Sequence, residues 1–219
     1  MASEERILVI GSGGREHALA WRLARDAGVE WVGVLPGNDG MARRFERASI
    51  RETDLAAVVA HAKQVGATLV VVGPEAPLAA GLVDALTAAG VSAFGPTAAA
   101  ARLESSKWFA KQVMREAGVP TARAEVFDAA EAAIVALDRF GPPWVLKADG
   151  LAAGKGVLVT SDREAAAAFA RACLEGRRFG EGGLRLVLEE HLAGEEASVL
   201  AICDGERWVL LPPARDYKR

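Results

Sequence analysis

The chain has 219 residues, of which 51% are hydrophobic, and its formal net charge is -3 at pH 7. This length and hydrophobic content predict a folded globular protein with one large domain or two ordinary ones. The slightly acidic balance provides no basic face for a phosphate backbone, which argues against a nucleic-acid partner.

Cysteine usage and the first residues indicate the compartment. Cys173 and Cys203 lie far apart and show no paired spacing, so neither a zinc site nor a disulfide framework is predicted. The acidic start and the short apolar run 7–10 do not fit a signal peptide, and no segment reaches the length of a membrane span. We therefore expect a cytoplasmic protein without a membrane partner.

In the first part of the chain, short apolar runs alternate with amphipathic stretches. Strands are expected at residues 7–10, 31–35, 69–72 and 92–94, and helices at 16–25 and 54–65. This alternation is typical of βαβ units and predicts a parallel sheet in an α/β fold. Glycine-containing turns follow three of the strands, at the sheet edge where ligands bind in such folds.

The pattern changes after Ser105, where we expect a mixed α+β region. Helices are predicted at 105–117, 128–139 and 162–175, strands at 144–147, 157–160 and 184–189, and a hairpin at 197–211 that turns at Asp204-Gly205. Ser105 or Ser106 would cap the first helix. Asp128 and Glu131 have the spacing of a capping box for the second helix.

The turn at residues 11–14 is rich in glycine and lies between a strand and a helix, where a phosphate can approach the backbone. A dinucleotide site would need a third glycine at position 16, but Glu16 stands there, and no acidic residue closes the second strand. NAD is therefore not predicted, and a tight turn without a ligand remains an alternative. Glu75 follows another strand and would bind sugar hydroxyls or an amine, or stabilise the next helix.

Two later segments carry a nucleotide hypothesis. Residues 148–156 join two expected strands without the spacing of a Walker A loop, and Lys147 precedes them at a strand end. Its ammonium could face nucleotide phosphates; the alternative is a surface hairpin with solvated lysines. Residues 186–196 run from an apolar strand into an acidic bend that could bind adenine and ribose, or could be a solvated turn.

These segments, in this order, resemble the glycinamide ribonucleotide synthetases, a family of ATP-grasp ligases. The matching pieces are IGSGGREHALAW, PGN, VGPEAPL, FGPT, LESSK, KADGLAAGKGV and EEHLAGEEAS. The resemblance covers essentially the whole chain. It implies a Rossmann-like N-terminal domain at 1–103, the start of a central ATP-grasp domain at 104–121, a small ATP-covering subdomain at 122–192 and truncated central strands at 193–219.

The resemblance also implies site residues. Lys107 and Lys147 would contact the ATP phosphates and assist catalysis, with Gly154 in the covering loop. Glu189 and Leu192 would bind adenine through their backbone.

The remaining implied contacts belong to the sugars. Glu195 would bind the ribose of ATP, whereas Gly13, Gly14 and Glu75 would contact phosphoribosylamine. Arg215 stands where the family usually has glutamine, so no role is predicted for it.

The implied activity is ATP-dependent ligation of glycine to 5-phosphoribosylamine through glycyl phosphate, by a monomeric enzyme that uses magnesium. The family continues beyond Arg219, where we expect the metal ligands, so the fragment alone is expected to be inactive. Two alternatives stay open: another ATP-grasp carboxylate–amine ligase, such as a relative of carbamoyl-phosphate synthetase or biotin carboxylase, and a non-catalytic nucleotide-binding fragment.

Overall fold

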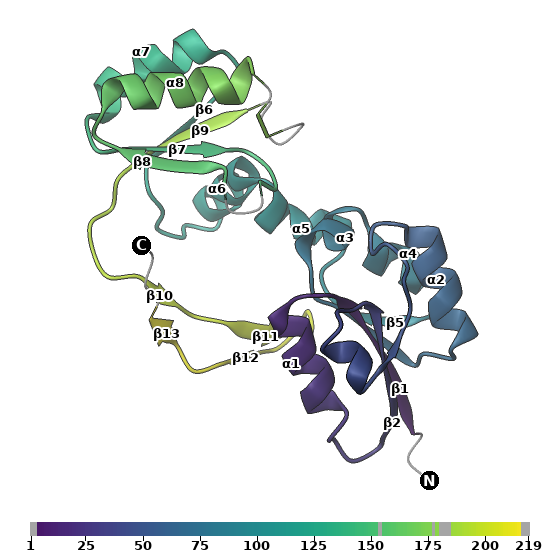
Figure 1. The fold of residues 1–219 in the computed structure, drawn as a ribbon. Coiled ribbons are helices and arrows are strands. Elements are labelled where there is room, and N and C mark those ends of the chain that lie inside the picture. The colour runs from purple at the N-terminus through teal and green to yellow at the C-terminus, as the bar shows by residue number, and fades with distance from the viewer. Residues whose placement is uncertain (1–3, 153–154, 177, 180–184, 216–219) are drawn as a thin grey trace.

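The computed structural model describes residues 4–152, 155–176, 178–179 and 185–215. Within these residues, one sheet lies in the first part of the chain, a second lies in the later part, and a thin ribbon of strands follows (Figure 1). Helix α5 (Ala98–Ser105) and helix α6 (Lys107–Glu116) connect the two sheets. Residue 103 lies inside α5, and the division of the chain into domains stays a prediction.

The first sheet is parallel and has the strand order β3-β2-β1-β4-β5. Its strands are β1 (Glu5–Gly11), β2 (Val29–Pro36), β3 (Glu46–Arg47), β4 (Leu69–Val72) and β5 (Ser92–Phe94). The central strand β1 is apolar on both faces because helices cover both of them. This sheet confirms the α/β fold and the Rossmann-like arrangement that the resemblance implies.

Alternate residues of β1 enter two separate cores. Leu8 and Ile10 pack in a core with α2 (Leu55–Gln64) and α4 (Leu82–Ala88). Ile7 and Val9 pack on the opposite face with α1 (Gly14–Leu23) and the short helix η1 (Met41–Arg43). A further helix, α3 (Glu75–Ala79), follows β4 directly. The glycine turn and Glu75 therefore lie at the carboxyl edge of one sheet, as the sequence predicts.

The second sheet is antiparallel, with the order β6-β9-β7-β8. Its strands are β6 (Ala124–Phe127), β7 (Trp144–Ala148), β8 (Val157–Thr160) and β9 (Leu186–Glu190). Helices α7 (Ala130–Phe140) and α8 (Arg163–Leu174) pack on one face, and α6 lies on the other side (Figure 1). The predicted capping box is wrong, because α7 begins after Ala129, and no side chain caps it.

The described residues after β9 form a ribbon that is exposed along its length. β10 (Ala197–Ser198) pairs with β13 (Ala214–Arg215), and β11 (Ala201–Cys203) pairs with β12 (Trp208–Leu210). The predicted hairpin turn is confirmed: the Oδ1 atom of Asp204 accepts hydrogen bonds from the amides of Glu206 (3.0 Å) and Arg207 (2.6 Å).

A helix that crosses a membrane must be both long and apolar. Among the described parts of the chain, no helix combines the length and the hydropathy that crossing a membrane requires.

Candidate functional site

A cleft of about 910 Å³ opens between helices α3, α5 and α6 and the second sheet. Its charged lining consists of three lysines and three glutamates: Lys107, Lys111, Lys147, Glu75, Glu104 and Glu189. Apolar side chains, among them Met114, Leu151, Val157 and Leu192, form part of the wall. Four residues that the resemblance assigns to ATP, namely Lys107, Lys147, Glu189 and Leu192, therefore line one cavity.

Lys147 and Glu189 form an ion pair across adjacent strands. Lys147 lies on β7 and its ammonium donates to the Oε2 atom of Glu189 on β9 at 2.8 Å. The Glu189 side chain is only 6% exposed, so this carboxylate needs a cationic partner. The resemblance assigns Glu189 a backbone role only, whereas the structure also places its carboxylate at the cleft.

Lys111 is a charged residue at the cleft that sequence reasoning missed. Its ammonium donates to the Oγ1 atom of Thr121 (2.8 Å) and to the carbonyl of Ala122 (2.9 Å), and lies 3.5 Å from the Oε2 atom of Glu189. Burial lowers the pKa of Lys111, and attraction by Glu189 opposes that shift. The available signal was its spacing of four residues from Lys107, which puts both lysines on one helix face.

Lys107 is the first residue of α6, and its ammonium donates to two backbone carbonyls, those of Ala148 and Gly150, at 2.9 Å each. Burial is the largest cause that lowers the pKa of Lys107, with the positive charge of Lys147 acting in the same direction. The ammonium groups of Lys147 and Lys111 thus lie 2.8 and 3.5 Å from the buried carboxylate of Glu189, and Lys107 lines the same cleft. Lysine ammonium groups of this kind can bind an anionic group such as a polyphosphate.

The glycine turn of the first sheet is occupied by a side chain of the protein itself. Glu16 is 5% exposed, and its Oε2 atom accepts a hydrogen bond from the amide of Gly13 at 2.8 Å. A Cβ atom on Gly73 would lie 2.4 Å from the Oε1 atom of Glu16, so this carboxylate fills the space that the glycine leaves. Gly14 begins α1, and a Cβ atom there would meet nothing within 4 Å.

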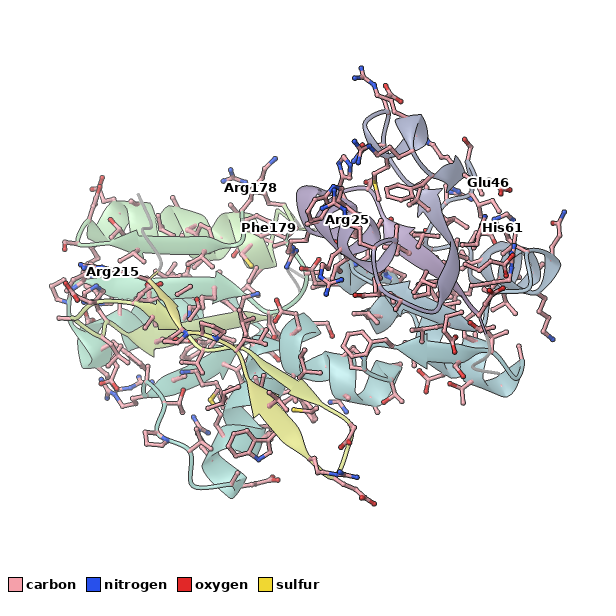
Figure 2. The ribbon with its side chains drawn as sticks, turned by 90° about the horizontal axis from the view of Figure 1, so that it is seen from below. Arg25, Glu46, His61, Arg178, Phe179 and Arg215 are labelled. Carbon is pink, nitrogen blue, oxygen red and sulfur yellow. The ribbon has the colours of Figure 1, made fainter. Side chains whose placement is uncertain are left out.

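Of the residues predicted to contact the two sugars, only Glu75 lines the cleft. Glu75 lines the cleft and accepts from Arg15 at 3.4 Å, but Gly13 and Gly14 are not part of the lining. Glu195 is exposed and pairs with Arg215 instead of lining the cleft. Figure 2 shows Arg215 on the side of the molecule away from Glu46 of β3 and His61 of α2. The contact roles of these residues stay predictions, and Gly154 lies outside the described residues.

Magnesium has no evident ligands here. Among the residues that the structure describes, no group of three or more His, Cys, Asp or Glu side chains could hold a metal ion. We therefore assign no residue to a metal.

Models of two family domains match the chain in succession. The phosphoribosylglycinamide synthetase N domain matches residues 5–104, and the phosphoribosylglycinamide synthetase ATP-grasp (A) domain matches residues 105–219. The phosphoribosylamine–glycine ligase of Phenylobacterium zucineum is 53% identical over 214 residues, which cover 97% of this chain and 50% of that protein. The ligase of Ralstonia nicotianae is 50% identical over 214 residues, with 98% and 51% covered.

A solved structure supports the same assignment. The crystal structure of the phosphoribosylamine–glycine ligase of Thermotoga maritima has a TM-score of 0.81 to this chain at 32% identity, and the match covers 98% of this chain and 51% of that one. The chain thus spans about half the length of the curated relatives it matches. Two family models in the expected order, identities near one half and the shared fold lead to one conclusion: the chain belongs to the phosphoribosylglycinamide synthetase family.

Proposed function

We propose that the protein to which this chain belongs joins glycine to 5-phosphoribosylamine at the expense of ATP, giving glycinamide ribonucleotide, ADP and phosphate. The family membership supports this reaction. One observation within the chain carries the nucleotide part of the proposal: Lys107, Lys111 and Lys147 line one cleft of about 910 Å³ together with Glu189. A cavity of this size with convergent charges is typical of a small-molecule site.

In the proposed reaction, the glycine carboxylate attacks the γ-phosphate of ATP, ADP leaves, and glycyl phosphate forms. The amine of phosphoribosylamine then attacks the glycyl carbonyl and phosphate leaves. Phosphoryl transfer asks the protein mainly for positioning and for neutralisation of charge. We assign charge neutralisation to Lys107 and Lys147, because both ammonium groups lie at the cleft.

The other parts of the cleft suit the remaining groups of the substrates. Backbone groups of Glu189 and Leu192 can bind the edge of adenine, and Leu151, Val157 and Leu192 offer apolar contact to the base. Glu75 lies at the border with the first sheet, where its carboxylate can bind sugar hydroxyls or the amine of phosphoribosylamine.

We further propose that the ligase acts in the cytoplasm as a monomer on small-molecule substrates. The two cysteines, which lie far apart in the sequence, fit a reducing compartment. Light scattering after size-exclusion chromatography tests the oligomeric state, and a dimer at micromolar concentration would contradict this part of the proposal.

Titration with ADP tests the nucleotide site. Lys147→Ala should weaken ADP binding, since a charge-assisted hydrogen bond contributes about 1.5 to 3 kcal/mol. Lys63→Ala is the matched control, because Lys63 is an exposed lysine on α2. Equal affinities of the two variants would remove Lys147 from the site.

In the complete enzyme, ADP release with glycine and phosphoribosylamine but not with bicarbonate separates the proposed ligase from other ATP-grasp enzymes.

A further inference from the structure

Asp149 is a buried carboxylate directly after β7, and neither the lining of the cleft nor the proposed chemistry includes it. Its side chain is 0% exposed and forms an ion pair with Arg185 at 2.6 Å. Its own amide also donates to the carbonyl of Arg185 at 2.9 Å. A carboxylate without solvent contact is costly unless it is fully paired, so each of its partners matters to the structure.

The other partners of Asp149 belong to the first turn of α6, more than forty residues earlier in the chain. The hydroxyl of Ser106 donates to both carboxylate oxygens at 3.1 and 3.3 Å, and the amide of Trp108 donates to Oδ1 at 3.1 Å. The hydroxyl of Ser106 also accepts from the amide of Phe109 at 3.1 Å. The start of α6 is thus capped twice, once by its own N-cap residue and once by a distant carboxylate, whose charge favours a helix N-terminus.

Lys107 also connects the start of α6 to the residues around Asp149, in this case with α6 supplying the donor. Its ammonium donates to the carbonyls of Ala148 and Gly150, the two residues that flank Asp149. An ammonium has three donor hydrogens, so these two bonds leave one for a ligand. Lys107 and Gly150 both line the cleft.

We propose that Asp149 is a positioning residue for nucleotide binding: it fixes the start of α6 against the beginning of the glycine-rich loop, and so holds the ammonium of Lys107 at the cleft. The inference rests on the proposed function, in that the ligand is taken to be a nucleotide. Asp149 does not touch the ligand in this scheme. Loss of its charge releases the first turn of α6, and Lys107 then loses its fixed position relative to residues 148–150.

The test compares Asp149→Asn with Asp162→Asn in the 219-residue chain. Asp162 is a matched control because it also caps a helix in the later half, accepting from the amide of Glu164 at 2.9 Å, but it caps α8 and does not line the cleft. We expect Asp149→Asn to weaken ADP binding about tenfold, the change that about 1.4 kcal/mol produces, and Asp162→Asn to leave it unchanged. Equal ADP affinities in the two variants would overturn the inference.

Limited trypsin digestion gives a readout that does not depend on the nucleotide. Lys155 is exposed and lies in the loop that Asp149 anchors, so Asp149→Asn should raise cleavage after Lys155 relative to cleavage after exposed Lys63. A merely structural role would raise both rates together and would refute positioning. If the wild-type chain does not bind ADP, the assignment of this cleft to a nucleotide fails for the 219-residue chain, while the cleavage ratio still decides whether Asp149 anchors the loop.

A second variant covers the case in which Asp149→Asn does not fold. Arg185→Gln removes the ion pair from its half-exposed side and leaves the buried carboxylate with its bonds to α6. We expect this variant to show the same selective rise in cleavage after Lys155 and a smaller loss of ADP affinity. An unchanged cleavage ratio in a folded Arg185→Gln variant would count against the anchoring role.

Discussion

At the scale of single residues, the partly buried Lys107 and the buried Lys111 are expected to give the site a pH dependence. Burial lowers the pKa values of Lys107 and Lys111 below the ordinary value of 10.5, so both lose their charge earlier in an alkaline titration than an exposed lysine does. Phosphates bind the charged form, and ADP affinity should therefore fall as the pH rises through the lowered pKa values. A titration series from neutral to alkaline pH measures this.

The free energy of unfolding should rise with pH in the range where the ADP affinity falls. Between the lowered folded pKa and the unfolded value of 10.5, the unfolded chain binds more protons, so the contribution of these lysines to the free energy of unfolding increases with pH. Lys111→Met should remove part of this slope. An ADP affinity that stays constant up to pH 10.5 would contradict the assignment of these ammonium groups to the nucleotide site.

The contact between Gly73 and Glu16 is a second residue-scale prediction. A Cβ atom at position 73 would lie 2.4 Å from the Oε1 atom and 2.5 Å from the Cγ atom of Glu16. Gly73→Ala should therefore lower the free energy of unfolding by about 1 to 3 kcal/mol, as overpacking does. In a Glu16→Ala background the same change should cost much less, because the obstructing side chain is gone. Urea unfolding of the four chains gives the coupling, and additive effects would show that Glu16 is not the obstacle.

The sequence identified the lysines that lie at the end of a strand or at the start of a helix, but not the residues that hold them. Lys107 and Lys147 belong to short recognisable motifs. The roles of Lys111 and Asp149 depend on partners such as Ala122 and Ser106, which only the folded chain brings within hydrogen-bond distance. Glu16 was noted as the residue that breaks a dinucleotide fingerprint, but its burial against glycines of two strands required the structure.

At the scale of elements, the N-terminus of α7 lacks a side-chain cap, and adding one should stabilise the protein. The N-cap residue of α7 is Ala129, which is exposed, has an extended backbone and offers no side-chain acceptor to the first turn. Ala129→Asp should raise the free energy of unfolding by about 1 kcal/mol, the usual value of an N-cap bond. Asp162→Ala should remove a similar amount from α8, where the cap exists. Thermal unfolding measures both, and a loss of stability in Ala129→Asp would contradict the cap assignment.

Strands with continuous apolar runs were predictable, and so was the short strand β5, whereas the short strands β3 and β6 were not predicted. The cores of β1 and β4 were expected because continuous apolar runs between glycines indicate strands covered on both faces. Strand β6 was missed, since its four residues, only partly apolar, carry no periodicity and become a strand by pairing with β9. Helices α5 and α6 are separated at Ser106, whose backbone is extended and whose hydroxyl caps α6 and bonds to Asp149.

At the scale of the whole molecule, the chain spans about half the length of the ligases it resembles. We expect the purified 219-residue chain to fold, to bind adenine nucleotide weakly and to form no glycinamide ribonucleotide from ATP, magnesium, glycine and phosphoribosylamine. The triphosphate needs a metal ion, and the described residues offer no group of side chains to hold one. The full-length Thermotoga maritima ligase serves as the positive control, and turnover by the chain comparable to that control would contradict the prediction.

The exposed ribbon after β9 implies that this molecule has two regimes of amide hydrogen exchange. The hydrogen bonds between β11 and β12 join residues close in sequence, and the residues of both strands are exposed, so these bonds can open without disturbing either sheet. Val9 and Ile10 at the centre of β1 are 0% exposed, and their amides should exchange only when the first sheet unfolds. Deuterium should therefore label residues 201–210 within the shortest exposure and reach β1 last.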